Sequence, residues 1–240
     1  MKTTGKAAAD HELLKRGASG PWTDLGLTLP IFVAYHLGVV FLPVRNAADV
    51  VTLELTALAK NDLLSYTGPT LAIGAVFVGT LVVLGRGHAL RWERFAMIAL
   101  EGVVYAVAMR LLAGYVVGRV FLLPSVVADK FTGVVMSLGA GFYEELAFRV
   151  VLFGLGVKLL ALLFPSLPLG RLGLHLVWAV VAASVFSGWH YIGDLGDAFD
   201  ARSFVFRWVC GLVFTCIYFF RGFAPAVWTH ALYDLWVLVL

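Results

Sequence analysis

The sequence predicts an all-α protein, a polytopic transmembrane helical bundle of about 7–8 spans. Its 240 residues are 61% hydrophobic and only 14% charged, and the mean hydropathy is +0.91. A soluble domain has about 45–50% apolar and about 25% charged residues. The apolar segments are as long as membrane-spanning helices and lack the short alternation of barrel strands. These observations indicate an integral membrane protein.

Seven candidate spans follow from a length of about 17–25 apolar residues per crossing. They cover residues 25–42, 69–85, 95–118, 134–164, 174–192, 204–220 and 224–240. The fourth is long enough to tilt, or to break near Pro165. Residues 45–66 are amphipathic and mixed in charge, which predicts an interfacial or loop helix.

The chain divides into a short polar segment and one large domain. Residues 1–24 are polar and mixed in charge, so we expect a cytoplasmic tail or an interfacial helix there. Residues 25–240 are predicted to form a single transmembrane domain, with a motif-bearing core at about 130–240. Basic tracts with interleaved aromatic residues are not visible, which argues against a nucleic-acid partner.

Lysine and arginine are distributed unequally between the predicted loops. Alternate connections carry an excess of them: Lys2, Lys6, Lys15 and Arg16 before the first span, Arg86, Arg91 and Arg94 after the second, Arg171 after the fourth and Arg221 after the sixth. The positive-inside rule therefore favours a cytoplasmic N-terminus. We expect a multi-pass protein of a prokaryotic cytoplasmic (inner) membrane.

Three charged residues stand inside the fourth apolar span: Glu144, Glu145 and Arg149. A charge at the centre of a membrane helix is unfavourable by about 2.5–3.5 kcal/mol on insertion scales. Glu145 and Arg149 are four residues apart, so they can pair on one face of a helix. Glu144 lies about 100° away around the helix and is left for other work. A carboxylate placed in this way suits general base chemistry.

Two further polar clusters lie downstream in the predicted spans. His190 ends the fifth span, and His230 and Asp234 are four residues apart in the last one. A histidine and a carboxylate at that spacing can bind a metal together, or form hydrogen bonds around a developing oxyanion. Each cluster could instead be structural, as an ion pair that locks a bundle or as an interfacial histidine. A structural role leaves the second glutamate unexplained.

In order, the three clusters resemble the motifs of the CAAX-protease and bacteriocin-processing (CPBP, or Abi) family of intramembrane endopeptidases. The matching motifs are Glu144-Glu145-x-x-x-Arg149, Phe186-x-x-x-His190 and His230-x-x-x-Asp234, and the stretch Arg221-Gly222-Phe223-Ala224-Pro225 is also similar. The resemblance covers roughly residues 130–240. Three motifs in this order on an apolar background are a specific signal.

The resemblance implies a peptidase in which Glu144 activates the attacking water. Glu145 and Arg149 would form a supporting pair, and His190 would hold or polarise the water. His230 and Asp234 would stabilise the tetrahedral oxyanion or complete a metal site. The substrate would be the membrane-anchored or C-terminal segment of a protein or peptide, within the lipid bilayer.

The cofactor is left open between zinc and none. If a metal is present, its ligands would be Glu144, His190, His230 and Asp234, which suit zinc in type. The spacing is equally compatible with metal-free water activation. The family more commonly has Asn where this chain has Asp234, and an Asp donates a hydrogen bond only when protonated. An ionised Asp234 would favour a cation.

Two other functional classes fit part of the pattern. A membrane transporter or proton-coupled carrier also uses buried Glu, His and Asp residues as proton relays. Such a carrier typically shows symmetry between its two halves, which this sequence does not. A catalytically silent immunity or scaffold membrane protein is a third class, and the intact set of motif residues argues against it.

The predicted spans do not bring the motif residues to one depth. Counting 1.5 Å per residue places His190 near the outer end of the fifth span and His230 near the inner end of the last. The two histidines should meet at one site, so either the predicted boundaries are wrong or a span is broken or re-entrant.

Overall fold

A computed structural model describes residues 20–42, 46–50, 54, 62–84, 91–118, 129–164, 170–193 and 196–240. The described residues form helices and connections without a strand, which confirms the predicted all-α class. The elements are α2 (Pro21–Leu27), α3 (Leu29–Val39), α5 (Leu63–Leu84), α6 (Trp92–Val116), α7 (Lys130–Gly139), η1 (Ala140–Glu144), η2 (Leu146–Leu155), α8 (Gly156–Leu163), α9 (Gly170–Trp189), α10 (Ala201–Arg221) and α11 (Phe223–Val239).

Five helices among the described residues are long and apolar enough to cross a membrane. They are Leu64–Val83, Trp92–Val116, Lys130–Leu163, Gly170–Trp189 and Ala201–Arg221, and they correspond to predicted spans two to six. The protein is therefore a multi-pass membrane protein. The last predicted span is α11, which has 17 residues.

The first predicted span, residues 25–42, is two helices rather than one. Thr28 separates α2 from α3, and α3 has only 11 residues. Pro30 stands in the first turn of α3, where a missing backbone N–H is tolerated, so the chain can restart a helix there. The predicted tail, residues 1–24, is described only from Gly20, and α2 begins at Pro21. Half of the predicted helix at residues 45–66 falls outside the described residues, and its last four residues belong to α5.

The fourth span is continuous and unusually wound. Residues Lys130–Leu163 form one helix of 34 residues, so it is not broken before the position of Pro165, which lies outside the described residues. Its centre, η1 and η2, has the wider π-helical winding on either side of Glu145. Such π-segments inside α-helices occur frequently at functional sites. Glu144 and Glu145 lie at the junction of the two segments.

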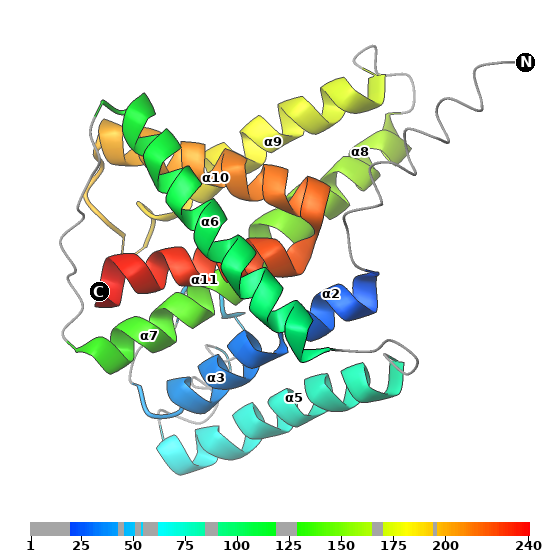
Figure 1. The fold of residues 1–240 in the computed structure, drawn as a ribbon, viewed down its shortest axis with the longest axis vertical. Coiled ribbons are helices and arrows are strands. Elements are labelled where there is room, and N and C mark those ends of the chain that lie inside the picture. The colour runs from blue at the N-terminus through cyan, green and yellow to red at the C-terminus, as the bar shows by residue number, and fades with distance from the viewer. Residues whose placement is uncertain are drawn as a thin grey trace, which may run out of the picture.

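α11 occupies the centre of the bundle. In Figure 1, α6 crosses over α10 and α11, α7 runs beside α11, and α5 forms an outer edge beside α3. The described residues of α11 are largely buried from Phe223 to Tyr233. By contrast, α5 and α6 expose large apolar side chains such as Val76 and Leu111, as expected of faces turned to lipid.

η1 and α11 are in direct contact because one residue between them has no side chain. A Cβ atom built on Gly141 would lie 2.6 Å from the Cβ of Ala231 and 2.8 Å from its backbone nitrogen. Small residues at helix interfaces let backbones approach closely in membrane proteins. This approach brings the glutamates after Gly141 next to the residues around Ala231.

We expect Gly141→Ala to push η1 away from α11, because the added methyl group meets backbone rather than a flexible side chain. The variant should lose thermal stability in detergent, measured by the unfolding temperature. Gly74→Ala in α5 is the matched control, since a Cβ there meets nothing within 4 Å. Equal unfolding temperatures for the two variants would contradict the close-contact argument.

The turn between α10 and α11 is held by charged side chains from two other helices. Gly222 has φ of 103°, a conformation that side chains disfavour, and it lets α11 fold back against α10. Arg221 forms a two-point ion pair with Glu101 of α6. Asp24 of α2 accepts hydrogen bonds from the backbone N–H groups of Phe223 and Ala224 and so caps α11.

Removal of the Asp24 cap should destabilise α11 in a pH-dependent way. Asp24→Ala is expected to lower stability by about 0.5–2 kcal/mol. Burial raises the pKa of the Asp24 carboxyl from 3.8 to about 6, so the fold favours its protonated form. The stabilising contribution is therefore present at low pH and is lost as the pH rises through about 6.

Unfolding temperatures of wild type and Asp24→Ala, taken below and above pH 6, measure this trend. Asp62→Ala is a matched control, because the exposed Asp62 carboxylate also accepts a backbone hydrogen bond, from Ser65, but its pKa is lowered. The contribution of Asp62 should fall with decreasing pH. If the difference in unfolding temperature between wild type and Asp24→Ala grows as the pH rises, the assignment is refuted.

Candidate active site

Glu145 is fully buried and has charged or ionisable partners on both oxygens. Its Oε2 lies 3.1 Å from Nε of Arg149, four residues along the same helix, as an ion pair rather than an aligned hydrogen bond. Its Oε1 accepts a hydrogen bond of 2.7 Å from Nδ1 of His230 on α11. Glu145 thus ties the long helix Lys130–Leu163 to α11.

Arg149 is enclosed by aromatic rings. Its guanidinium carbon lies 4.3 Å from the ring centre of Phe186 on α9 and 5.0 Å from that of Phe214 on α10. Cation–π contacts of this kind stabilise a desolvated arginine. The arginine side chain is only 1% exposed, so Glu145 and these rings provide its main compensation.

Glu144 has a different set of neighbours, and its hydrogen-bond donor is a neutral amide rather than a cation. Its Oε1 accepts a hydrogen bond of 3.0 Å from the side-chain amide of Asn46. Its Oε2 is buried and, among the described parts of the chain, accepts no hydrogen bond. Nε2 of His190 and Nε2 of His230 both lie 4.0 Å from this oxygen. Side chains from η1, from the residue that follows α9 and from α11 therefore converge on one small volume.

The hydrogen bonds on the far side of each imidazole define what its Nε2 can do. Nδ1 of His190 contacts the carbonyl oxygen of Phe186 at 2.9 Å, and a carbonyl only accepts, so Nδ1 carries the hydrogen. Nε2 of a neutral His190 is then an acceptor that faces Glu144. Nδ1 of His230 donates to Glu145, so its Nε2 is the atom directed at the shared volume.

The predicted separation of the two histidines was wrong. The ring of His190 leans back by one turn to the carbonyl of Phe186, in the direction that helical side chains favour. His230 lies in the middle of α11, which doubles back against α10, and its ring stacks on Phe214 at 4.5 Å between centres. Counting rise per residue ignores both effects, and no break in α9 or α11 is required.

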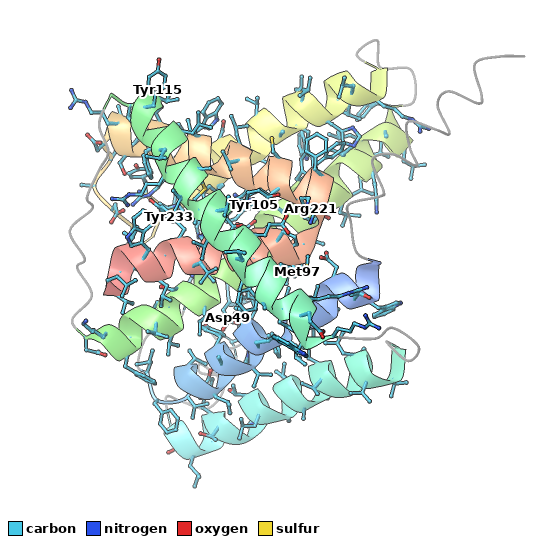
Figure 2. All side chains as sticks on the ribbon, in the orientation of Figure 1. Asp49, Met97, Tyr105, Tyr115, Arg221 and Tyr233 are labelled. Atoms are coloured by element: carbon cyan, nitrogen blue, oxygen red, sulfur yellow. The ribbon has the colours of Figure 1, made fainter. Side chains whose placement is uncertain are left out.

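Asp234 lies at the open side of the site. Its Oδ2 is 3.5 Å from Nε2 of His230, and its side chain is 22% exposed. A cavity of about 200 Å³ lies at this site, and its lining includes Glu144, His190, Arg207, His230, Tyr233 and Asp234. All six predicted site residues therefore contribute to one cluster, with Glu145 and Arg149 behind it. Tyr233 is labelled in Figure 2 at this end of α11.

The donor geometry can be compared with that of a metal site. Two ligands of a tetrahedral zinc ion at about 2.0–2.1 Å lie about 3.3 Å apart. The oxygen of Glu144 and each imidazole nitrogen are 4.0 Å apart. Within the part of the chain that the structure describes, groups of three or more His, Cys, Asp or Glu residues that could hold a metal ion are not found. The separations between Glu144 and the two imidazoles are thus longer than those between the ligands of a tetrahedral zinc ion.

Sequence reasoning missed Asn46. It lies between the first two predicted spans, 98 residues before Glu144, and it belongs to none of the three motifs. A single polar residue in a mixed loop gives no signal that would distinguish it from its neighbours.

Residues 126–236 match the family model described as Type II CAAX prenyl endopeptidase Rce1-like. The match contains all six motif residues and confirms the resemblance to the CAAX protease family. Searches of curated proteins and of solved structures gave no match.

The ion pair between Arg149 and Glu145 generates a stability prediction. Arg149→Met should destabilise the protein by about 3–5 kcal/mol, because the Glu145 charge stays buried without its partner. The double variant Arg149→Met/Glu145→Gln should recover much of that loss, since it removes both charges. Unfolding temperatures in detergent measure the effect as a double-mutant cycle. Equal instability of the double and single variants would show that the pair is not coupled.

Proposed function

We propose, from the match of residues 126–236 to the family model of Rce1-like type II CAAX prenyl endopeptidases, that this protein hydrolyses a peptide bond by glutamate-activated water attack. The family indicates a peptidase that acts in the membrane. The observation that carries the finer proposal is Oε2 of Glu144, which is buried, accepts no hydrogen bond from the residues that the structure describes, and faces two imidazole nitrogens at 4.0 Å.

The distances support a water molecule held between the three groups. A water that accepts or donates hydrogen bonds of about 2.8 Å can bridge atoms 4.0 Å apart. Glu144 would accept one proton from the water, and the resulting hydroxide would attack the scissile carbonyl carbon. Glu144 would then deliver that proton to the leaving amine nitrogen, which completes the hydrolysis. Positioned general bases contribute about 10²–10⁴-fold to such reactions.

The oxyanion formed by attack needs a donor, and His230 is the best placed. Its Nδ1 donates to the Glu145 carboxylate, and its Nε2 faces Asp234 and Glu144. When protonated, the ring donates at both nitrogens, so Nε2–H can stabilise the developing negative charge. Asp234 would act through His230 rather than as a direct donor. Glu145 and Arg149 would fix the orientation of that imidazole.

The substrate we propose is a membrane-anchored protein or peptide cleaved near its anchored or C-terminal segment. The cavity beside Asp234 is small, about 200 Å³, and fits an extended backbone rather than a folded domain. For the location, we propose a prokaryotic cytoplasmic membrane. The distribution of lysine and arginine between the loops supports a cytoplasmic N-terminus.

Loss of the Glu144 carboxylate should abolish cleavage. The assay uses the purified protein in proteoliposomes, a quenched fluorescent peptide that ends in a prenylated cysteine and three further residues, and an unprenylated apolar peptide as a second probe. Glu144→Ala should lower kcat by about 10²–10⁴-fold with the unfolding temperature retained. The control is Glu93→Gln, an exposed glutamate in the first turn of α6. Normal cleavage by Glu144→Ala, or no cleavage by wild type, would refute the proposal.

The same assay tests whether cleavage depends on zinc. We expect a chelator to leave the rate unchanged, because the donor separations suit a bridging water. Loss of activity with chelator and its recovery with added zinc would assign Glu144, His190, His230 and Asp234 as ligands instead.

A further inference from the structure

The carboxylate of Glu144 is held from outside the motif-bearing part of the chain. Nδ2 of Asn46 donates to Oε1 of Glu144 over 3.0 Å, and both side chains are buried. Asn46 precedes the family-matched segment, residues 126–236, and lies in the connection that follows α3. It contacts the oxygen of Glu144 that does not face the histidines.

The orientation of the Asn46 amide is determined by its second partner. Its Oδ1 accepts a hydrogen bond of 2.9 Å from the backbone N–H of Ala48. An N–H group donates only, so the oxygen must face Ala48 and the NH2 group must face Glu144. The backbone carbonyl of Asn46 also accepts from the N–H of Asp49 at 3.0 Å, which closes a tight turn.

This turn is fixed to the rest of the protein. Asp49, labelled in Figure 2, is fully buried, and its Oδ2 accepts a hydrogen bond of 2.7 Å from the hydroxyl of Tyr35 on α3. Beside it, the hydroxyl of Tyr143, the residue before Glu144, lies 2.9 Å from Nε2 of His36. Because Nδ1 of His36 donates to the carbonyl of Phe32, its Nε2 accepts from Tyr143. The turn and the start of the Glu144 motif are thus both anchored on α3.

A carboxylate held at one oxygen has a defined direction at the other. With Oε1 bonded to Asn46, rotation of the carboxylate is restricted, and Oε2 stays directed at the two Nε2 atoms. An amide carries no charge, so it fixes the carboxylate without neutralising it. Arg149 fulfils the opposite requirement at Glu145, where the charge has to be compensated.

We propose that Asn46 is a positioning residue of the peptidase: its amide fixes the Glu144 carboxylate so that Oε2 faces His190 and His230. The inference rests on the proposed function, because it assigns Asn46 a part in the work of Glu144. It also gives the N-terminal part of the chain, through α3 and the turn at Asn46, a direct influence on the reaction.

The test compares Asn46→Ala and Asn46→Asp with wild type in the cleavage assay described above. Asn46→Ala frees the carboxylate and should lower kcat by about 10²-fold with little change in KM, since small displacements of a reacting group have effects of that size. Asn46→Asp keeps the size of the side chain and the acceptor for Ala48, so it serves where Asn46→Ala does not fold. It places a second carboxylate against Glu144, which disfavours the ionised form of both. As the pH is lowered, the activity of Asn46→Asp should therefore be lost at a higher pH than that of wild type.

The pH profile separates positioning from simple structural support. Tyr35→Phe is the matched control: it removes the hydroxyl that donates to Asp49 in the same turn but leaves the side-chain amide of Asn46 in place beside Glu144. Tyr35→Phe should keep the wild-type pH profile, whereas Asn46→Asp should not. If wild type cleaves and Glu144→Ala does not, but both Asn46 variants keep the wild-type kcat and pH profile, the role of Asn46 is refuted. If Glu144→Ala still cleaves, the proposed function itself fails.

Discussion

The rest of the site depends on the burial of one ionised side chain, Glu145. A carboxylate without solvent exposure needs compensation on both oxygens, and the chain supplies it from Arg149 on the same helix and from His230 on α11. Removal of one partner from such a buried pair costs far more stability than removal of one partner from an exposed ion pair. The long helix Lys130–Leu163 and α11 are therefore coupled in register, and the position of His230 follows from that of Glu145.

Short contacts between polar groups require short distances between helices. Gly141 lets η1 touch Ala231, and Gly211 lets α10 approach Ala183 and Phe186 of α9. In lipid there is no hydrophobic driving force between helices, so packing and interhelical hydrogen bonds hold them together. The small residues and the polar cluster thus depend on each other: close backbones make the hydrogen bonds possible, and the hydrogen bonds stabilise the close approach.

Local spacing explains which parts of this arrangement could be predicted. Glu145 with Arg149, and His230 with Asp234, are four residues apart, and helical geometry alone brings such pairs together. The long spans could be predicted from hydropathy, because length and composition decide them. The break at Thr28 and the depth of His190 could not, since the apolar character continues across Thr28 and the depth of His190 depends on the direction of its side chain. Asn46 could not be predicted either, because its contact spans 98 residues and leaves no periodic signal.

Two adjacent glutamates acquire different properties because their partners differ in charge. Glu145 contacts a guanidinium and an imidazole and is fully enclosed. Its charge is compensated by these partners, and the contacts hold the helices together. Glu144 contacts a neutral amide at one oxygen, and its other oxygen accepts no hydrogen bond within the described residues. A base must be charged, directed and able to accept a proton. Glu144 meets the last two conditions by geometry, and a neutral donor such as Asn46 preserves the first. If the two glutamates exchanged partners, the charge of Glu144 would be neutralised by Arg149, and the charge of the buried Glu145 would be left without compensation.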